Sequence, residues 1–245
     1  MPTGFKYALS WSRLSDYQQC ARKFKLKYID KASNFQEDDK DKSPHLVRGG
    51  NVHRALETYV LKRKAGQNEI PVSSLEEVES TKPLIERYVD AFGLQNVHPE
   101  QQISVNQNWS QVEWFDRASF YRAIFDFIAL KYEDTVVTYV DIVDWKTGKF
   151  KDYSADQPGQ LELSAAIAMA LWPQAKEVAT RYVYVDHKKT ITRKFEREKD
   201  GEYLKMHFIK EHAKVNNDEA FDPTMNEFCK YCQATKLQCQ YSRKL

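Results

Sequence analysis

Two acidic residues next to apolar segments are the strongest chemical signal in the sequence. Asp144 ends the segment 140–144 and Lys146 follows two residues later, while Asp126 stands inside the apolar segment 123–128. Residues two apart on a strand share a face, so Asp144 and Lys146 are expected to point the same way. A buried carboxylate without a partner is costly, so such an acid usually has a cation or a hydrogen-bond donor beside it.

If the two segments pair as strands, Asp126 and Asp144 converge. Carboxylate oxygens are the ligands that Mg²⁺ and Mn²⁺ prefer, which predicts a divalent-cation site with Lys146 beside it, placed to orient a water or offset the charge of a phosphate. His53 and Glu57 are four residues apart on an expected helix, hence on one face, and supply a third element. A structural salt bridge is the alternative for each acid taken alone.

The segments that must position these residues follow from the spacing of apolar residues. We expect helices at 10–29, from just after Gly49-Gly50, at 74–92, at 156–171 and at 198–214. We expect strands at 101–112, 120–130, 135–146, 177–186 and 190–195, and a charged connector at 35–43. Helices, strands, a helix, strands and a helix in this order predict an α/β fold with a mixed sheet covered by helices.

Length and composition limit the class of protein. The chain has 245 residues, 42% of them hydrophobic, and a formal charge of +2. This composition excludes disordered and fibrous classes, and the length predicts one large domain or one domain with a small appendage. The longest uncharged apolar stretch, 163–175, has 13 residues, fewer than the ~20 that span a membrane. Residues 1–6 lack the apolar stretch of a secretory signal, so we expect a cytoplasmic protein with no membrane partner.

Three motifs in order resemble the RecB-type branch of the PD-(D/E)XK nuclease superfamily. They are residues 48–57 (RGGNVHRALE), 124–126 (IFD) and 143–148 (VDWKTG), preceded by residues 9–14 (LSWSRL). The chain is similar to the compact form found in CRISPR adaptation nucleases and in phage exonucleases. The resemblance covers residues 9–239 and implies a restriction-endonuclease-like fold, with a mixed sheet flanked by helices.

The resemblance implies a role for each residue of the predicted site. His53, Asp126 and Asp144 would bind Mg²⁺ or Mn²⁺. The backbone carbonyl of Trp145 would be a further ligand, and Lys146 would be the catalytic lysine.

Two helical positions extend the resemblance. Glu57 matches the family's helix-borne glutamate, which has a catalytic or structural role, and Gln160 matches a glutamine that contacts DNA or the active site. Ser164 stands where the family carries a tyrosine. We expect Glu57 and Gln160 among the catalytic residues.

The four cysteines are Cys20, Cys229, Cys232 and Cys239. The spacing of Cys229 and Cys232 alone is shared by zinc sites and redox dithiols. The resemblance implies that all four ligate a 4Fe–4S cluster, with zinc as the alternative. Such a cluster would join residues 1–32 and 221–245 into a subregion beside a catalytic core at 47–217, within a single nuclease domain.

The resemblance and the predicted site together imply a metal-dependent DNA nuclease, an exonuclease on single strands or duplex ends rather than an endonuclease. The basic stretches 13–31 and 188–199 could track phosphates or be solvated faces. Aromatic residues near the first stretch could stack bases, although we expect most of them in the core; they are Trp11, Tyr17, Phe24 and Tyr28.

Two alternatives of other classes stay open: a catalytically silent DNA-binding or adaptor module, and a partner-dependent subunit of a recombination or CRISPR-adaptation complex. The chain carries no Gly-x4-Gly-Lys-Ser/Thr motif, so a helicase would have to be another protein. The host would be a bacterium, or a bacterium infected by a virus that encodes this chain.

Overall fold

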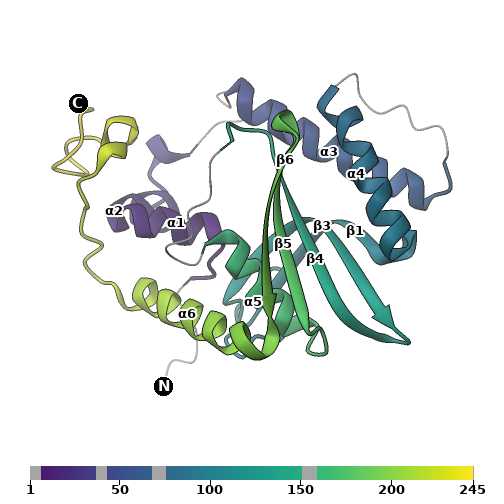
Figure 1. Cartoon of the computed structure of the whole chain (residues 1–245). Coiled ribbons are helices and arrows are strands. Elements are labelled where there is room, and N and C mark those ends of the chain that lie inside the picture. The colour runs from purple at the N-terminus through teal and green to yellow at the C-terminus, as the bar shows by residue number, and fades with distance from the viewer. Residues whose placement is uncertain (1–6, 37–42, 68–75, 151–158, 245) are drawn as a thin grey trace.

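A six-stranded sheet forms the centre of the molecule, in a computed structural model that describes residues 7–36, 43–67, 76–150 and 159–244. The strands are β1 (Val97–Val105), β2 (Gln111–Val112), β3 (Tyr121–Glu133), β4 (Val136–Lys146), β5 (Glu177–Tyr184) and β6 (Lys189–Glu196). Their order across the sheet is β2-β1-β3-β4-β5-β6 (Figure 1). β4 and β5 run parallel, and the other neighbouring pairs are antiparallel, which confirms the predicted mixed sheet.

Helices cover both faces of this sheet. The α-helices are α1 (Trp11–Gln19), α2 (Ala21–Phe24), α3 (Pro44–Lys64), α4 (Glu76–Phe92), α5 (Gln160–Leu171) and α6 (Arg197–Asn217). Short 3₁₀ helices span Ser33–Phe35, Leu94–Asn96, Val185–His187 and Glu227–Tyr231, and a π-helical turn spans Lys25–Ile29. α3 and α4 pack on one face, α5 and α6 on the other (Figure 1). None of the helices in the described ranges has the length and apolar content to cross a bilayer.

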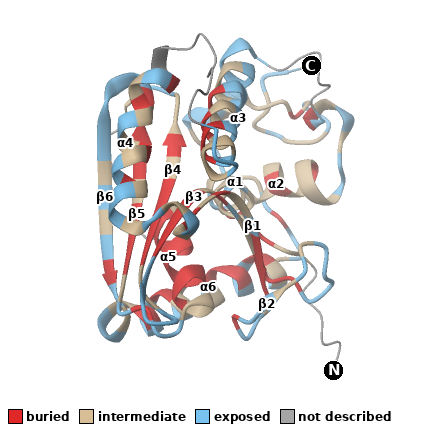
Figure 2. Ribbon diagram, turned by 90° about the vertical axis from the view of Figure 1, so that its right-hand side faces the viewer, coloured by how far each residue is buried: buried red, intermediate tan, exposed pale blue. Residues whose placement is uncertain are grey.

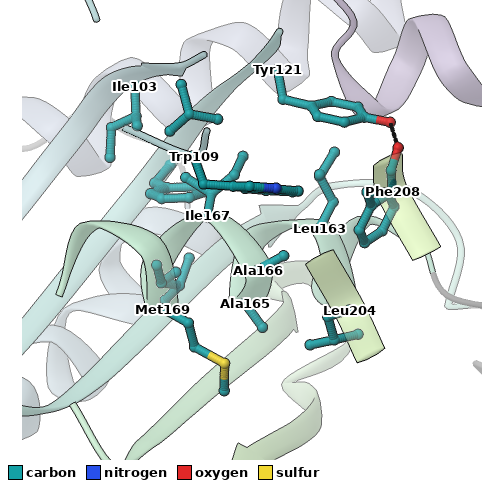
Figure 3. Packing of buried hydrophobic residues seen from close by; sticks show 14 of the residues in the cluster. Ile103, Trp109, Tyr121, Leu163, Ala165, Ala166, Ile167, Met169, Leu204 and Phe208 are labelled. Atoms are coloured by element: carbon teal, nitrogen blue, oxygen red, sulfur yellow. Dashed lines mark hydrogen bonds between the residues drawn. The ribbon is translucent and has the colours of Figure 1, made fainter. Parts of the chain in front are cut away.

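The larger core lies between the sheet and helices α5 and α6. Nine successive residues of α5, 161–169, are buried, and Figure 2 shows buried residues gathered on this helix and on the central strands. Figure 3 shows the small side chains of Ala165 and Ala166 in this core, among larger ones such as Leu163 and Leu204. In the same core the Tyr121 hydroxyl donates to the Phe208 carbonyl across 2.8 Å. Most residues of α5 are apolar, as is typical of a helix that is enclosed by protein.

The connection from β4 to β5 determines where the chemistry is located. Parallel strands cannot be joined by a tight turn, so the chain crosses over through α5. β4 ends at Lys146 and α5 begins at Gln160, which places the start of the helix beside the carboxyl end of the strand. Polar side chains from both elements can therefore meet there.

The first predicted helix is interrupted. The apolar spacing predicts one helix over 10–29, but the backbone at Cys20 is extended, with φ −166° and ψ 113°. The Cys20 N–H donates to the Asp16 carbonyl and ends α1, while the Cys20 carbonyl accepts from the Phe24 N–H as α2 begins. No glycine or proline marks this break, so the sequence pattern could not predict it.

The second predicted helix begins earlier than expected. The prediction starts it after Gly49-Gly50, whereas α3 begins at Pro44, with the Ser43 hydroxyl accepting from the Leu46 N–H. Proline is well suited to the first turn of a helix because it lacks the N–H that would go unpaired there. Gly49 lies inside α3, where an added Cβ would come within 3.0 Å of Thr147 Oγ1. The glycine therefore allows α3 to pass close to the end of β4.

Other boundaries differ less. The expected strand 101–112 is the hairpin of β1 and β2, and the expected strand 177–186 ends two residues early, at Tyr184. α4 ends before Gly93, whose φ of +87° suits glycine, as predicted. The expected starts at 74 and 156 and most of the connector 35–43 lie outside the described residues.

The N-terminal helices and the C-terminal segment lie side by side, in Figure 1 the yellow segment beside the purple helices. Asn226 Nδ2 donates to the Gln19 carbonyl across 2.9 Å, and Asn34 Nδ2 donates to the Gln233 carbonyl across 2.6 Å. A small apolar cluster joins the same segments; its buried members are Leu26, Phe35 and Ala234.

Candidate active site

Three polar side chains meet at the carboxyl end of β4. Lys146 Nζ lies 2.6 Å from Asp144 Oδ2 and donates to Gln160 Oε1 across 3.1 Å. Gln160 Nε2 donates in turn to Asp144 Oδ1 across 2.6 Å. Each of the three residues thus contacts the other two, and the two strand residues come together as the two-residue spacing predicts.

Tyr182 of the neighbouring strand, β5, contacts this group of side chains. β5 runs parallel to β4 with Tyr182 opposite Asp144. The Tyr182 hydroxyl donates to Gln160 Oε1 across 3.3 Å, and the Lys146 ammonium lies 4.6 Å from the centre of the Tyr182 ring. A cation over an aromatic face is attracted by the ring's quadrupole, so Tyr182 holds both the lysine and the glutamine in place.

Asp126 and His53 lie beside this group. The backbone pairing of β3 with β4 reaches Phe127 opposite Val143, and beyond it the Asp126 carboxylate accepts the Trp145 N–H across 2.8 Å. The other carboxylate oxygen lies 3.4 Å from His53 Nδ1 on α3. Asp126 therefore links three elements: β3, the end of β4 and α3.

Burial and charge shift the pKa values of this cluster. Burial raises the pKa of Asp144 to about 6 against the pull of the nearby Lys146 ammonium, and the negative charge of Asp126 adds to the rise. Burial alone would lower the pKa of His53, but the contact with Asp126 and the charges of Asp126 and Asp144 raise it overall. The two acids and the imidazole are thus close enough to act on one another, and a perturbed carboxyl of this kind is typical of functional sites.

A further acid, Glu100, belongs to the same cluster and was not predicted. It lies on β1 with φ +44°, between Pro99, which pairs with Phe127, and Gln101. Burial raises its pKa, as do the charges of Asp126 and Glu57. A proline within a strand indicates an irregular ladder, and that was the available signal for Glu100. Glu57 itself is half-buried on α3, one turn after His53.

The donor set fits a hard divalent cation. It comprises the carboxylates of Asp126 and Asp144, the His53 imidazole and the carbonyl of Trp145, which are ligand types for Mg²⁺ and Mn²⁺. Among the residues that the structure describes, the buried Asp144 Oδ2 has the ion contact with Lys146 and no hydrogen bond, so it can accept a further cation. Within the described ranges, however, no three His, Cys, Asp or Glu residues are grouped as ready-made metal ligands.

All four cysteines line one cavity between the chain ends. The interruption of the first helix places Cys20 there, and the last described segment brings the other three; each is half-buried and none is in a disulfide. Thiols are the ligand type of a soft metal or an iron–sulfur group, so the side chains fit such a group by their chemistry. The part of the chain that the structure describes shows no cluster-forming group of three, so the ligation itself stays a prediction.

The basic stretches are less positive than their composition indicates. Lys23 and Lys27 both contact Asp16, at 2.7 and 3.0 Å, and Lys194 pairs with Glu177 at 3.1 Å. Of the four aromatic residues named from the sequence, Phe24 is buried in the larger core, and Tyr17 and Tyr28 pack on it. These three rings therefore stabilise the fold and are not free to stack bases, which confirms that most of this set is core.

One of the comparisons with known proteins shows the family of this chain. The family model described as "PD-(D/E)XK nuclease superfamily" matches residues 8–240, a range that includes the whole sheet, the candidate site and the four cysteines. A solved structure titled "Crystal structure of SSO0001" is 13% identical, covering 93% of this chain and 84% of that chain with a TM-score of 0.45, too slight a likeness to add to the family match. No curated protein matches.

Proposed function

This chain belongs to the PD-(D/E)XK nuclease superfamily, and we propose that it is a metal-dependent DNA nuclease that hydrolyses phosphodiester bonds. The observation that carries the proposal is the contact between the Lys146 ammonium and Asp144 across 2.6 Å, held by Gln160. Asp126 and His53 act on the charge of the same carboxylate. An ammonium, two carboxylates and an imidazole in one place can bind a cation, a water and a phosphate group together.

In this proposal, His53, Asp126, Asp144 and the Trp145 carbonyl would hold Mg²⁺ or Mn²⁺. Bound there, the ion would polarise a phosphate oxygen and lower the pKa of a bound water. The distance of 3.4 Å between His53 Nδ1 and Asp126 Oδ1 supports this set, because ligands of one ion must lie close together.

The remaining residues act on substrate and water. Lys146 offsets the negative charge of the phosphate and orients the attacking water, and Gln160 holds its ammonium in position. Glu57 and Glu100 add negative charge on the His53 side of the site, where each can accept a hydrogen bond from water.

The finer assignment is an exonuclease that acts on single-stranded DNA or duplex ends, as the resemblance to the RecB-type branch implies. A catalytically silent DNA-binding module is disfavoured, because Asp126, Asp144 and Lys146 are all present and grouped. A subunit that is active only with recombination or CRISPR-adaptation proteins, or with a helicase, stays the second candidate. The cytoplasmic location stays an expectation from the sequence.

A 4Fe–4S cluster on Cys20, Cys229, Cys232 and Cys239 completes the proposal, with zinc as the alternative. Its support is that one cavity gathers the four thiols from both chain ends. The cluster would fasten the subregion 1–32 plus 221–245 beside the catalytic core 47–217.

The test is cleavage of DNA labelled within the strand by the full chain with Mg²⁺ or Mn²⁺, on linear single strands, blunt duplexes and closed circles. We expect the linear forms to be degraded and the circles to persist. Lys146→Ala should lower the rate about 100- to 1,000-fold, because a charge-stabilising donor is lost. Lys131→Ala, at the far end of β3 opposite Tyr139, is the matched control. If the wild-type chain cleaves none of the three substrates with either metal, the nuclease proposal is wrong.

A further inference from the structure

A hollow of about 540 Å³ lies directly beside the candidate site. Its walls come from residues 8–13, from the loop between β2 and β3, from the start of β3 and from the first turns of α5. Gln160 lines this hollow and also accepts the hydrogen bond from Lys146. The hollow and the site therefore share a wall, and a ligand in the one reaches the other.

Aromatic side chains form the rim of the hollow. Phe115, on the loop between β2 and β3, is 84% exposed, and its neighbour Trp114 and the more distant Trp11 are half-buried. The Arg122 guanidinium lies 5.6 Å from the Trp114 ring and 5.8 Å from the Phe115 ring. A large apolar ring left in water at the edge of a pocket is typical of a binding surface.

Two positive charges face the same hollow. Arg13 donates to the Ala8 carbonyl across 2.9 Å, and Arg122 donates to the Ser119 hydroxyl across 3.0 Å. In the described ranges neither guanidinium forms an ion pair with a carboxylate. Lys23 on α2 and Lys27 on the π-helical turn, by contrast, both pair with Asp16. Burial and the charge of Arg13 lower the pKa of Arg122, which shows that the two cations are close enough to repel. An anion between them would relieve that repulsion.

We propose that this hollow binds an unpaired segment of the DNA strand next to the bond that is cut, an inference that rests on the proposed nuclease function. Bases stack on Trp114 and Phe115, and phosphates lie against Arg13 and Arg122. Flat rings beside cations are what proteins use to hold single strands without reading their sequence. The faces of bases inside a duplex are covered by their neighbours, so the rings favour a strand end that has come unpaired.

The test measures binding with cleavage stopped. A fluorescein-labelled DNA strand of roughly 12 nucleotides is titrated with the full chain in EDTA, and fluorescence anisotropy gives the affinity. Phe115→Ala should weaken binding about 5- to 100-fold, because one base of the DNA loses the protein ring on which it stacks. A strand of the same length with abasic sites throughout should bind wild type and variant alike. Tyr203→Ala is the matched control, since Tyr203 is an exposed ring that does not line the hollow.

A second variant tests the charges independently of the rings. Arg122→Gln keeps a donor for Ser119 but removes one phosphate contact, so the slope of log affinity against log salt should fall by about 0.7. Thermal melting of each variant shows whether it has kept its fold.

The outcomes separate this inference from the nuclease function. Equal binding of the DNA strand by wild type and Phe115→Ala overturns the proposal that the hollow binds unpaired DNA. An equal loss of affinity for single strand and blunt duplex in Phe115→Ala overturns it as well. Tighter binding of RNA of the same sequence overturns the assignment to DNA. Metal-dependent cleavage that is absent while binding still depends on Phe115 overturns the proposed function alone. If cleavage persists and Phe115→Ala leaves the affinity for DNA unchanged, only the proposal about the hollow is overturned.

Discussion

Gln160 Nε2 donates a hydrogen bond to Asp144 Oδ1 across 2.6 Å, which ties the first residue of α5 to the last residues of β4. The Gln160 carbonyl oxygen accepts from Lys146 at the same time. One amide thus contacts the acid with its donor and the ammonium with its acceptor. The geometry of the proposed catalytic pair depends on how the crossover helix packs on the sheet.

Removing this amide should slow the reaction without weakening DNA binding. In Gln160→Ala, Asp144 and Lys146 keep their mutual contact but lose their common partner. We expect kcat to fall about 10- to 100-fold, as for other residues that orient a metal site, with little change in KM for DNA. Gln160→Glu should be impaired as well, because a carboxylate cannot donate to Asp144. Steady-state kinetics and melting curves check both variants, and an unchanged kcat in Gln160→Ala would show that the amide positions nothing.

Asp126 should separate stability from activity. Its carboxylate accepts the Trp145 N–H across 2.8 Å. Asp126→Asn keeps an acceptor for that N–H, whereas Asp126→Ala leaves it without a partner at a cost of about 1–3 kcal/mol. We therefore expect the alanine variant to unfold at lower denaturant concentration than the asparagine variant, while both lose cleavage. Equal stability of the two variants would contradict the role given to this hydrogen bond.

The central strands and the paired site residues could be predicted because local pattern determines them. Asp144 and Lys146 share a face because side chains two apart on a strand point the same way. The apolar residues around them indicate that this segment is a strand. His53 came from helical spacing, and the structure places it 3.4 Å from Asp126. In each case, the information lies within a few residues of the side chain concerned.

What could not be predicted depends on contacts between distant segments. The extended backbone at Cys20 occurs without a glycine or proline, so no local signal marks it. Glu100 joins the site through an irregular β1–β3 ladder. Trp114 and Phe115 line a hollow only because the loop between β2 and β3 lies near α5 and the N-terminal segment. Sequence spacing carries no information on such tertiary neighbours.

The cysteine cavity makes a prediction about colour and metal content. If the four thiols ligate a 4Fe–4S cluster, protein purified without air should be brown, with visible absorption that bleaches on reduction. Cys20→Ser should lower the iron and sulfide content, because that ligand alone comes from the other end of the chain. Metal analysis and absorption spectra check this. Stoichiometric zinc without iron or sulfide would support the alternative and exclude the cluster.

His212 predicts how stability depends on pH. It is fully buried on α6, its ring stacks on Phe120 with centroids 4.1 Å apart, and its Nε2 lies 2.9 Å from the Tyr7 carbonyl. Burial lowers the pKa of His212 to about 4. In the unfolded chain this histidine has an ordinary pKa of about 6.5. Between pH 4 and pH 6.5, His212 is therefore protonated in the unfolded chain and neutral in the folded chain. Stability from this group is complete above the unfolded pKa and is lost as the pH falls toward 4.

The expected loss for wild type is about 2 kcal/mol of unfolding free energy between pH 7 and pH 5 from this histidine alone. His212→Gln removes the titration, so its unfolding free energy should change less over the same interval, even if the variant is less stable at pH 7. Urea unfolding of both proteins at the two pH values measures the difference, and other titrating groups cancel because they are common to both. Identical pH dependence in the two proteins would mean that His212 can accept its proton in the folded state.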